Sequence, residues 1–206
     1  MRLFLLARHG QSELNVSRRI NGDPTVAVQL TPVGEDESRG LGLEVANVAL
    51  DLCIYTRFGR TRATAEIALS GRSVPFAAEP LFDDIDVGDL EGQTIEDYRA
   101  WKHSHTRDQP FPDGESLNQA AHRYAAALER LLGRPERRIL VICHEIPIRY
   151  ALNGAAGSDS LDAPAHEIGN CVLHLFDEAG IERAIAGIES LAPPSQAAGE
   201  RSAAGS

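Results

Sequence analysis

Short continuous runs of apolar residues alternate along this chain with longer stretches in which apolar residues recur every three or four positions. The runs cover residues 3–7, 52–55, 74–78 and 139–143, and continuous runs are typical of strands buried on both faces. The stretches between them, with their start and stop signals, predict helices over residues 33–50, 60–69, 94–103, 116–132 and 146–152. Strands that alternate with helices predict an α/β domain with a mostly parallel sheet.

The end of the chain departs from this alternation. Residues 171–176 and 182–188 predict two late strands at a sheet edge, joined by a turn over residues 177–180. Residues 192–206 are rich in proline, alanine, glycine and serine, which predicts a disordered tail. A single domain is therefore expected over residues 1–191, a length that suits one core.

Composition is that of a soluble globular protein, with 43% hydrophobic and 24% charged residues. No apolar run approaches the roughly 20 residues that cross a bilayer, nor the stretch of about 7–15 residues of a secretory signal. We therefore expect a cytoplasmic protein with no membrane partner. Each of the three cysteines, Cys53, Cys143 and Cys171, lies in an apolar run, which predicts buried free thiols.

The net charge of −10 narrows the choice of partners. Non-specific nucleic-acid binding needs a basic surface, so no nucleic-acid partner is expected. An anionic small molecule remains possible, because a few arginines can form a local positive pocket. Nineteen of the twenty basic residues are arginines, Lys102 being the exception, and this bias lowers the weight of any single arginine.

Reactive side chains follow four strands of the predicted sheet. They are Arg8 and His9 after the first strand, residues 56–62 after the second, Asp83 and Asp84 in the loop after the third, and His144 after the fourth. In an open parallel sheet, ligands bind beyond the carboxyl ends of the strands. A single side chain of this kind more often has a structural role than a catalytic one. Reactive side chains at the ends of four strands together indicate one shared site.

At these residues the sequence resembles the histidine phosphatase superfamily, which includes cofactor-dependent phosphoglycerate mutases and many phosphomonoesterases. The pattern R-H-G-x-S/T-x-x-N is matched from Arg8 to Asn15, and S-x-L-x-R-A-x-x-T-A from Thr56 to Ala65, with the second arginine at Arg60. Residues 84–92 are similar to the acid loop E-x-x-x-G-x-x-E-G, residues 111–116 to the P-x-G-E-S element, and residues 139–144 to the strand that presents a second histidine.

The resemblance implies a phosphoglycerate mutase-like fold, a three-layer α/β/α sandwich, and a site that needs neither metal nor cofactor. It assigns catalysis to His9 as the nucleophile that carries the phosphoryl group, Asp84 as the proton donor and His144 as a stabilising donor. Phosphate binding falls to Arg8, Arg60 and Asn15. The chemistry is consistent, because neutral imidazole is a fair nucleophile near pH 7 and guanidinium forks hold phosphate oxygens.

Among the departures from the pattern, three concern the expected chemistry. The acid is usually glutamate, so Asp84 is one methylene shorter, and Asp83 beside it could take the role. Glu145 stands where glycine usually follows the second histidine. Its carboxylate would either enter the site and raise the pKa of His144, or point to solvent at the first turn of a helix. Thr56 replaces serine and keeps the hydroxyl.

Three functions are compatible with these residues. The first is a phosphomonoesterase working through a phosphohistidine, the second a mutase-type phosphotransferase, and the third a silent phosphate-binding domain. The family's mutases carry an insertion after the acid loop, whereas only residues 93–111 lie there in this chain, which favours the phosphatase. The expected partner is a small-molecule phosphomonoester; its identity, the oligomeric state and the role of His166 stay open.

Overall fold

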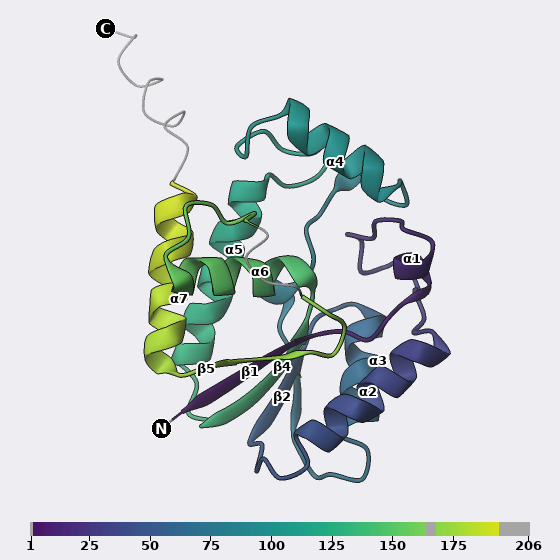
Figure 1. Ribbon diagram of the computed structural model, residues 1–206, viewed down its shortest axis with the longest axis vertical. Helices are drawn as coiled ribbons and strands as arrows, with labels where there is room; N and C mark the ends of the chain where they lie inside the picture. The colour runs from purple at the N-terminus through teal and green to yellow at the C-terminus, as the bar shows by residue number, and fades with distance from the viewer. Residues whose placement is uncertain (1, 164–167, 194–206) are drawn as a thin grey trace, which may run out of the picture.

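A five-stranded sheet forms the middle of the computed structural model, which describes residues 2–163 and 168–193 (Figure 1). Its strands are β1 (Leu3–Arg8), β2 (Leu52–Tyr55), β3 (Phe76–Ala78), β4 (Arg138–Cys143) and β5 (Leu173–Phe176). They lie in the order β3-β2-β4-β1-β5, in which β5 runs antiparallel to β1 and the other pairs are parallel. The predicted mostly parallel sheet is confirmed.

Helices cover both faces of this sheet. They are α1 (Glu13–Val16), α2 (Pro32–Glu44), α3 (Gly59–Ala68), α4 (Ile95–Ser104), α5 (Leu117–Leu132), α6 (Glu145–Ala156) and α7 (Glu178–Leu191), with short 3-10 turns at Pro80–Phe82 and Gly88–Leu90. In Figure 1, α2 and α3 lie on one side of the strands and α5, α6 and α7 on the other, while α4 stands apart above them. The predicted three-layer α/β/α sandwich is confirmed.

Alternate residues of β1 show why its apolar run is continuous. Phe4 and Leu6 point into the core beneath α5, α6 and α7, whereas Leu5 and Ala7 point into the core beneath α2 and α3. A strand covered on both faces excludes water from both, so every position favours an apolar side chain. The same burial encloses the cysteines, which are all free and buried, as predicted.

The prediction of a second late strand over residues 182–188 is wrong, because these residues belong to α7. Asp177 caps the helix by accepting a hydrogen bond from the backbone N–H of Gly180. Ile181, Ala184 and Ile188 are its buried apolar residues, and their spacing is that of one helix face packed against α5 and α6.

Several boundaries also differ from the prediction. The helix expected over residues 33–50 ends at Glu44, and the turns that follow bring Val45 and Leu50 into the core. Of the predicted tail, Ala192 is buried and hydrogen-bonded to Ile188, whereas residues 194–206 lie outside the described residues, as does His166. Within residues 2–163 and 168–193, no helix is long and apolar enough to cross a membrane.

Candidate active site

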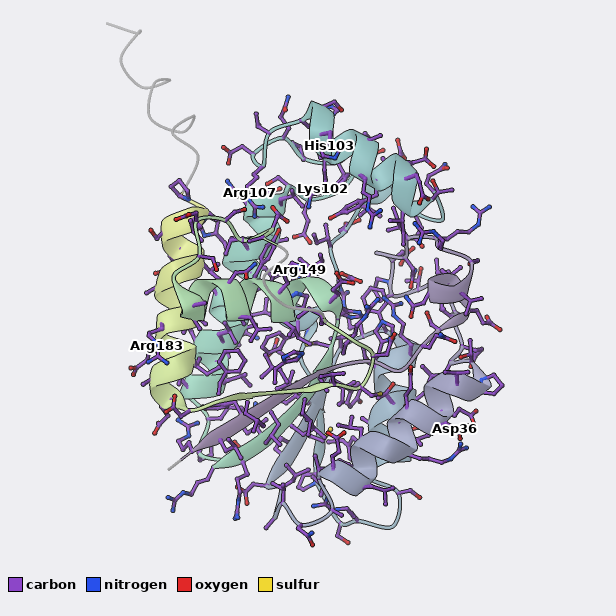
Figure 2. All side chains as sticks on the ribbon, in the orientation of Figure 1. Asp36, Lys102, His103, Arg107, Arg149 and Arg183 are labelled. Atoms are coloured by element: carbon purple, nitrogen blue, oxygen red, sulfur yellow. The ribbon has the colours of Figure 1, made fainter. Side chains whose placement is uncertain are left out.

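Beyond the carboxyl ends of the parallel strands lies a cavity of about 580 Å³. Residues on α4 and α6, including Lys102, His103 and Arg149, line two of its sides (Figure 2). Among the described residues, its charged lining comprises Arg8, Arg19, Arg60, Arg99, Lys102, Arg149, Asp84, Glu145 and Asp162. Cations outnumber carboxylates there although the chain has a net charge of −10, so the cavity suits an anionic ligand.

His9 lines the cavity directly after β1 and is 2% exposed. Its Nδ1 is 2.7 Å from the carbonyl oxygen of Gly10, which can only accept, so Nδ1 carries the proton. Nε2 therefore has the lone pair, and the Nε–H of Arg60 donates to it at 3.0 Å. Burial, followed by the charges of Arg60 and Arg8, holds the pKa of His9 well below its usual value. The ring is thus a neutral nucleophile at neutral pH.

Gly10 gives the loop after His9 its path. A Cβ at this residue would come within 2.4 Å of the carbonyl oxygen of Gly34, at the start of α2. Only glycine allows the backbone to approach that closely. The N–H of Gly10 also donates to Thr64 Oγ1 on α3 at 3.0 Å, so helices from one face of the sheet fix the loop that presents His9.

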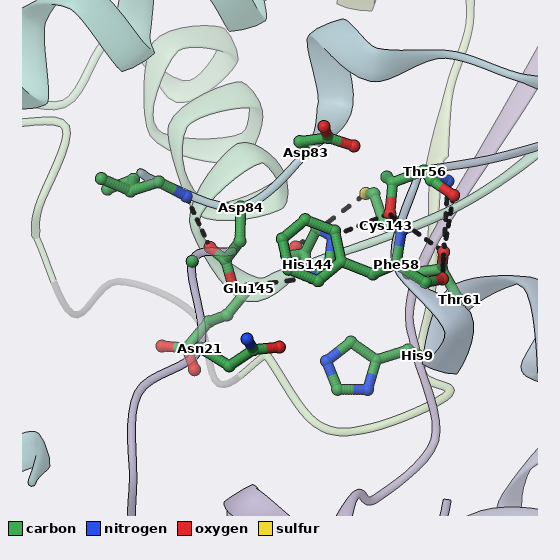
Figure 3. Close-up of polar contacts among 12 residues, drawn as sticks. His9, Asn21, Thr56, Phe58, Thr61, Asp83, Asp84, Cys143, His144 and Glu145 are labelled. Atoms are coloured by element: carbon green, nitrogen blue, oxygen red, sulfur yellow. Dashed lines mark hydrogen bonds and ion pairs between the residues drawn. The ribbon is translucent and has the colours of Figure 1, made fainter. Parts of the chain in front are cut away.

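His144 is fully buried at the end of β4, with its ring centroid 5.5 Å from that of His9. Its Nδ1 lies 3.5 Å from Asp84 Oδ2 (Figure 3). The same atom lies 3.2 Å from Arg60 Nη2. Burial lowers the pKa of His144 well below its usual value, and the charge of Arg60 lowers it further. In the resting site, His144 is therefore neutral and accepts the Arg60 N–H at Nδ1.

Arg60 joins the two imidazoles and is itself held by residues that the sequence did not point to. Its guanidinium lies 4.3 Å from the ring centroid of Phe58, Nη1 donates to the side-chain oxygen of Asn21, and Nη2 lies 3.3 Å from the Asn21 carbonyl oxygen. The side-chain amide of Asn21 in turn donates to Glu91 at 2.8 Å. The signal that the sequence offers for this support is Glu91, the acid of the E-G pair in the acid loop.

The two adjacent aspartates face different ways. Asp83 is 4% exposed and accepts hydrogen bonds from the backbone N–H and the Nε–H of Arg57, at 2.9 and 2.5 Å. Asp84 lines the cavity instead, with Oδ2 at 3.5 Å from both Arg60 Nη2 and His144 Nδ1. Burial raises the pKa of Asp84 above its usual value. Of the two, Asp84 is therefore the carboxyl that can hold and give a proton in the cavity.

Arg8 is the second cation beside His9, and its partner is unexpected. Its Nη1 lies 3.0 Å from a carboxylate oxygen of Glu145, whose other oxygen is 2.6 Å from Arg149. Glu145 therefore lies against the site rather than in solvent. The Nε of Arg8 is buried without a hydrogen-bond partner among the described residues. A buried unpaired donor is costly, so Arg8 is suited to receiving an anionic oxygen.

Asn15 is the third residue of the short helix α1 and is held by the cap of that helix. Its Oδ1 accepts from the N–H of Ser12 at 3.0 Å, and Ser12 Oγ accepts from the N–H of Asn15 at 3.4 Å. This reciprocal capping box uses the side-chain oxygen of Asn15, while the residue still lines the cavity. Its amide nitrogen makes no hydrogen bond within the described residues and is the group available to a ligand.

The assembled side chains can move a phosphoryl group. A neutral imidazole, two guanidinium groups and a protonatable carboxyl are the nucleophile, oxygen ligands and proton donor that such a transfer requires. Of the six residues singled out from the sequence, five line this cavity: His9, Asp84, Arg8, Asn15 and Arg60. The sixth, His144, is fully buried and contacts two of the lining residues, Arg60 and Asp84. In the part of the chain that the structure describes, no group of three His, Cys, Asp or Glu side chains could hold a metal ion.

Comparison with known proteins points to one superfamily. The model of the histidine phosphatase superfamily (branch 1) matches residues 4–189. The probable phosphoglycerate mutase GpmB of Proteus mirabilis is 31% identical over 180 residues, an alignment that covers 84% of this chain and 83% of that protein. The 2,3-bisphosphoglycerate-dependent phosphoglycerate mutase of a Methylobacterium species is 34% identical, with 81% and 86% covered. The alpha-ribazole phosphatase of Shigella flexneri shares the fold, with a TM-score of 0.75 at 22% identity over 85% of this chain and 90% of that one.

Proposed function

The chain belongs to the histidine phosphatase superfamily, and we propose that within it the protein is a metal-independent phosphomonoesterase that works through a phosphohistidine. One observation carries this proposal: His9, whose Nε2 is unprotonated, lines a cationic cavity that is also lined by Asp84. The substrate is a small-molecule phosphomonoester whose phosphoryl group binds beside His9.

In the first half-reaction, Nε2 of His9 attacks phosphorus and the bond from phosphorus to the ester oxygen breaks. Arg8 and Arg60 hold the non-bridging oxygens and stabilise the charge that develops on them. Asp84, protonated, gives its proton to the departing alkoxide. The alcohol leaves, and the phosphoryl group stays on His9.

The second half-reaction returns the site to its starting state. Asp84, now a carboxylate, takes a proton from a water molecule as the water oxygen attacks phosphorus. The bond from His9 Nε2 to phosphorus breaks, and orthophosphate leaves. His144 becomes a donor when its Nδ1 takes the proton of a phosphomonoester monoanion as the ester binds, because the negative phosphoryl group beside it offsets the burial and the charge of Arg60 that otherwise hold it neutral. It returns that proton to the departing orthophosphate.

Glu145 supports hydrolysis over transfer to a second phosphorylated molecule. Its carboxylate already pairs with Arg8 and Arg149, and Lys102 pairs with Asp162 at 2.9 Å. Fewer unpaired cations therefore remain for a second phosphate or carboxylate group, and the charge of Glu145 repels one. The relatives named as mutases favour the alternative, a cofactor-dependent phosphotransferase, which shares the phosphohistidine.

A screen of phosphomonoesters tests this proposal. Sugar phosphates, nucleotides and phosphoglycerates are assayed for orthophosphate release, with and without a chelator and with and without 2,3-bisphosphoglycerate. We expect release from at least one ester at a rate that the chelator leaves unchanged. A mutase would instead need the bisphosphate and interconvert phosphoglycerates faster than it releases phosphate. Phosphate binding with neither activity would identify a silent domain.

Replacing Glu145 is expected to change which substrates the site prefers. In Glu145→Gly, kcat/KM for a doubly phosphorylated substrate should rise about threefold to tenfold relative to a singly phosphorylated one of similar size, because a repulsive charge at a partly exposed site is removed. The difference should shrink at high salt. Glu145→Gln removes the charge but keeps the volume and should behave alike. Unchanged relative rates in both variants would contradict a role in selectivity.

A further inference from the structure

Two threonine hydroxyl groups lie behind His144, on the side away from the cavity (Figure 3). Thr56 follows β2 and Thr61 is in the first turn of α3, and both are fully buried. Thr56 Oγ1 lies 3.0 Å from His144 Nε2 and 2.9 Å from Thr61 Oγ1. Thr61 Oγ1 lies 2.8 Å from the carbonyl oxygen of Phe58. The three side chains and the carbonyl form one continuous hydrogen-bonded chain.

The Phe58 carbonyl at the end of this series of hydrogen bonds determines which group donates in each of them. A carbonyl oxygen can only accept, so Thr61 gives its single hydroxyl proton to Phe58. Thr61 Oγ1 is then an acceptor for the hydroxyl of Thr56 and for the backbone N–H of Thr56 at 3.2 Å. With its own proton committed, Thr56 Oγ1 can only accept from His144. Nε2 of His144 therefore carries the proton.

The opposite side of the ring requires the same arrangement. Arg60 has only N–H donors, and its Nη2 lies 3.2 Å from His144 Nδ1, so Nδ1 must offer a lone pair. A proton on Nδ1 would set two donors against each other in a buried place, where an unmade hydrogen bond is costly. Both sides of the ring thus fix one tautomer.

We infer that Thr61 is a positioning residue: through Thr56 it keeps the proton of His144 on Nε2, so that the ring offers Nδ1 to Asp84 and to the phosphoryl group. The superfamily pattern has alanine where this chain has Thr61, so the pattern alone does not supply this hydroxyl. The consequence for catalysis rests on the proposed phosphatase function, whereas the tautomer of His144 does not.

The inference gives His144 a single route for protons. Because Nε2 stays bonded to Thr56, the ring gains or loses a proton only at Nδ1, which is 3.5 Å from Asp84 Oδ2. In the resting site, Nδ1 is an acceptor for Arg60. When a phosphoryl group accepts the Arg60 N–H in place of the ring, Nδ1 is free to take a proton and becomes a donor toward Asp84 and the phosphoryl group. The hydroxyl chain therefore sets which ring atom responds to the ligand.

The test replaces the Thr61 hydroxyl and reads the tautomer directly. In Thr61→Val, Thr56 loses its acceptor and can donate to Nε2, so ¹⁵N NMR of the phosphate-free protein should show part of the His144 population protonated at Nδ1. On the best phosphomonoester, kcat should fall about twofold to tenfold, as expected for loss of one hydrogen bond, with KM unchanged. Thr61→Ser, which keeps the hydroxyl, should retain the wild-type tautomer and kcat. Thr61→Ala also lacks the hydroxyl but adds no methyl group in its place, so it repeats the test if the valine variant is strained. Ser38→Ala, which removes another buried hydroxyl, is the control.

The two readouts keep this inference separate from the proposed function. A wild-type His144 protonated at Nδ1, or an unchanged ¹⁵N spectrum in both Thr61→Val and Thr61→Ala, would overturn the inference whatever the enzyme hydrolyses. Equal losses of kcat in the valine and serine variants would show a packing role only. A protein that releases no phosphate but keeps the Nε2-protonated tautomer would overturn the proposed function and leave the tautomer assignment standing.

Discussion

In His9→Ala, turnover of the best phosphomonoester should fall by at least about 10³-fold, because the variant lacks the imidazole that takes the phosphoryl group. The fold should persist. The backbone N–H of His9 still donates to the carbonyl of Cys143 at 3.0 Å, and Asn170 still donates to the carbonyl of His9 at 2.7 Å. Kinetic assays and thermal unfolding together separate lost chemistry from lost structure.

The intermediate gives this prediction a second readout. Wild-type protein mixed with substrate and quenched in base should carry a base-stable, acid-labile phosphoryl group, and His9→Ala should carry none. His122→Ala removes an exposed histidine of α5 and serves as the matched control, with normal turnover and normal labelling. Substantial turnover in His9→Ala, or labelling that survives it, would place the nucleophile elsewhere.

The sheet could be predicted because burial leaves a direct trace in the sequence. Continuous apolar runs mark β1, β2 and β4, and a strand covered by helices on both faces has no polar positions. The prediction of a second late strand was wrong because the pattern there is too short to be decisive. Residues 182–188 mix apolar and small residues over a short stretch, and short stretches do not separate a period of two from one of 3.6. The polar residues at the N-terminus of α7, where Asp177 is the cap, also resemble those of a turn.

The centre of the site could be predicted from topology alone. His9 and His144 follow neighbouring parallel strands, β1 and β4, so their rings had to meet at one sheet edge. Asp83 and Asp84 could not be told apart, because adjacent residues share that placement. The choice depends on Arg57, 26 residues away, which takes Asp83 out of the cavity. A contact of this kind leaves no local trace in the sequence.

The residues that hold Arg60 and His144 in place could not be predicted either, because their contacts also depend on tertiary packing. Asn21 holds Arg60 from a loop that carries no pattern, and the position of Thr61 beside Thr56 appears only once α3 packs behind β4. The sequence marks Glu145 as unusual but leaves the direction of its side chain open. Its contact with Arg8 shows that it lines the site, yet burial and Arg60 still keep the pKa of His144 low.

Removing the carboxyl of Asp84 should separate substrates by their leaving groups. In Asp84→Asn, kcat for an alkyl phosphate should fall about 10²-fold to 10³-fold, the range of general-acid catalysis, because an alkoxide leaves poorly without a proton. An aryl phosphate such as p-nitrophenyl phosphate leaves with little help, so its kcat should fall less than about tenfold. Asp83→Asn is the matched control, since Asp83 faces Arg57 rather than the cavity, and it should not change the ratio of the two rates.

The pH dependence provides an independent check on the same carboxyl. Burial raises the pKa of Asp84, so its protonated, donating form persists to higher pH than that of an exposed aspartate and then declines as pH rises further. The low pKa of His9 leaves the nucleophile unprotonated across this range. For the alkyl ester, kcat of the wild type should therefore fall with rising pH, whereas in Asp84→Asn that fall should disappear. Equal losses on both esters, with the pH dependence retained, would assign leaving-group protonation to another group.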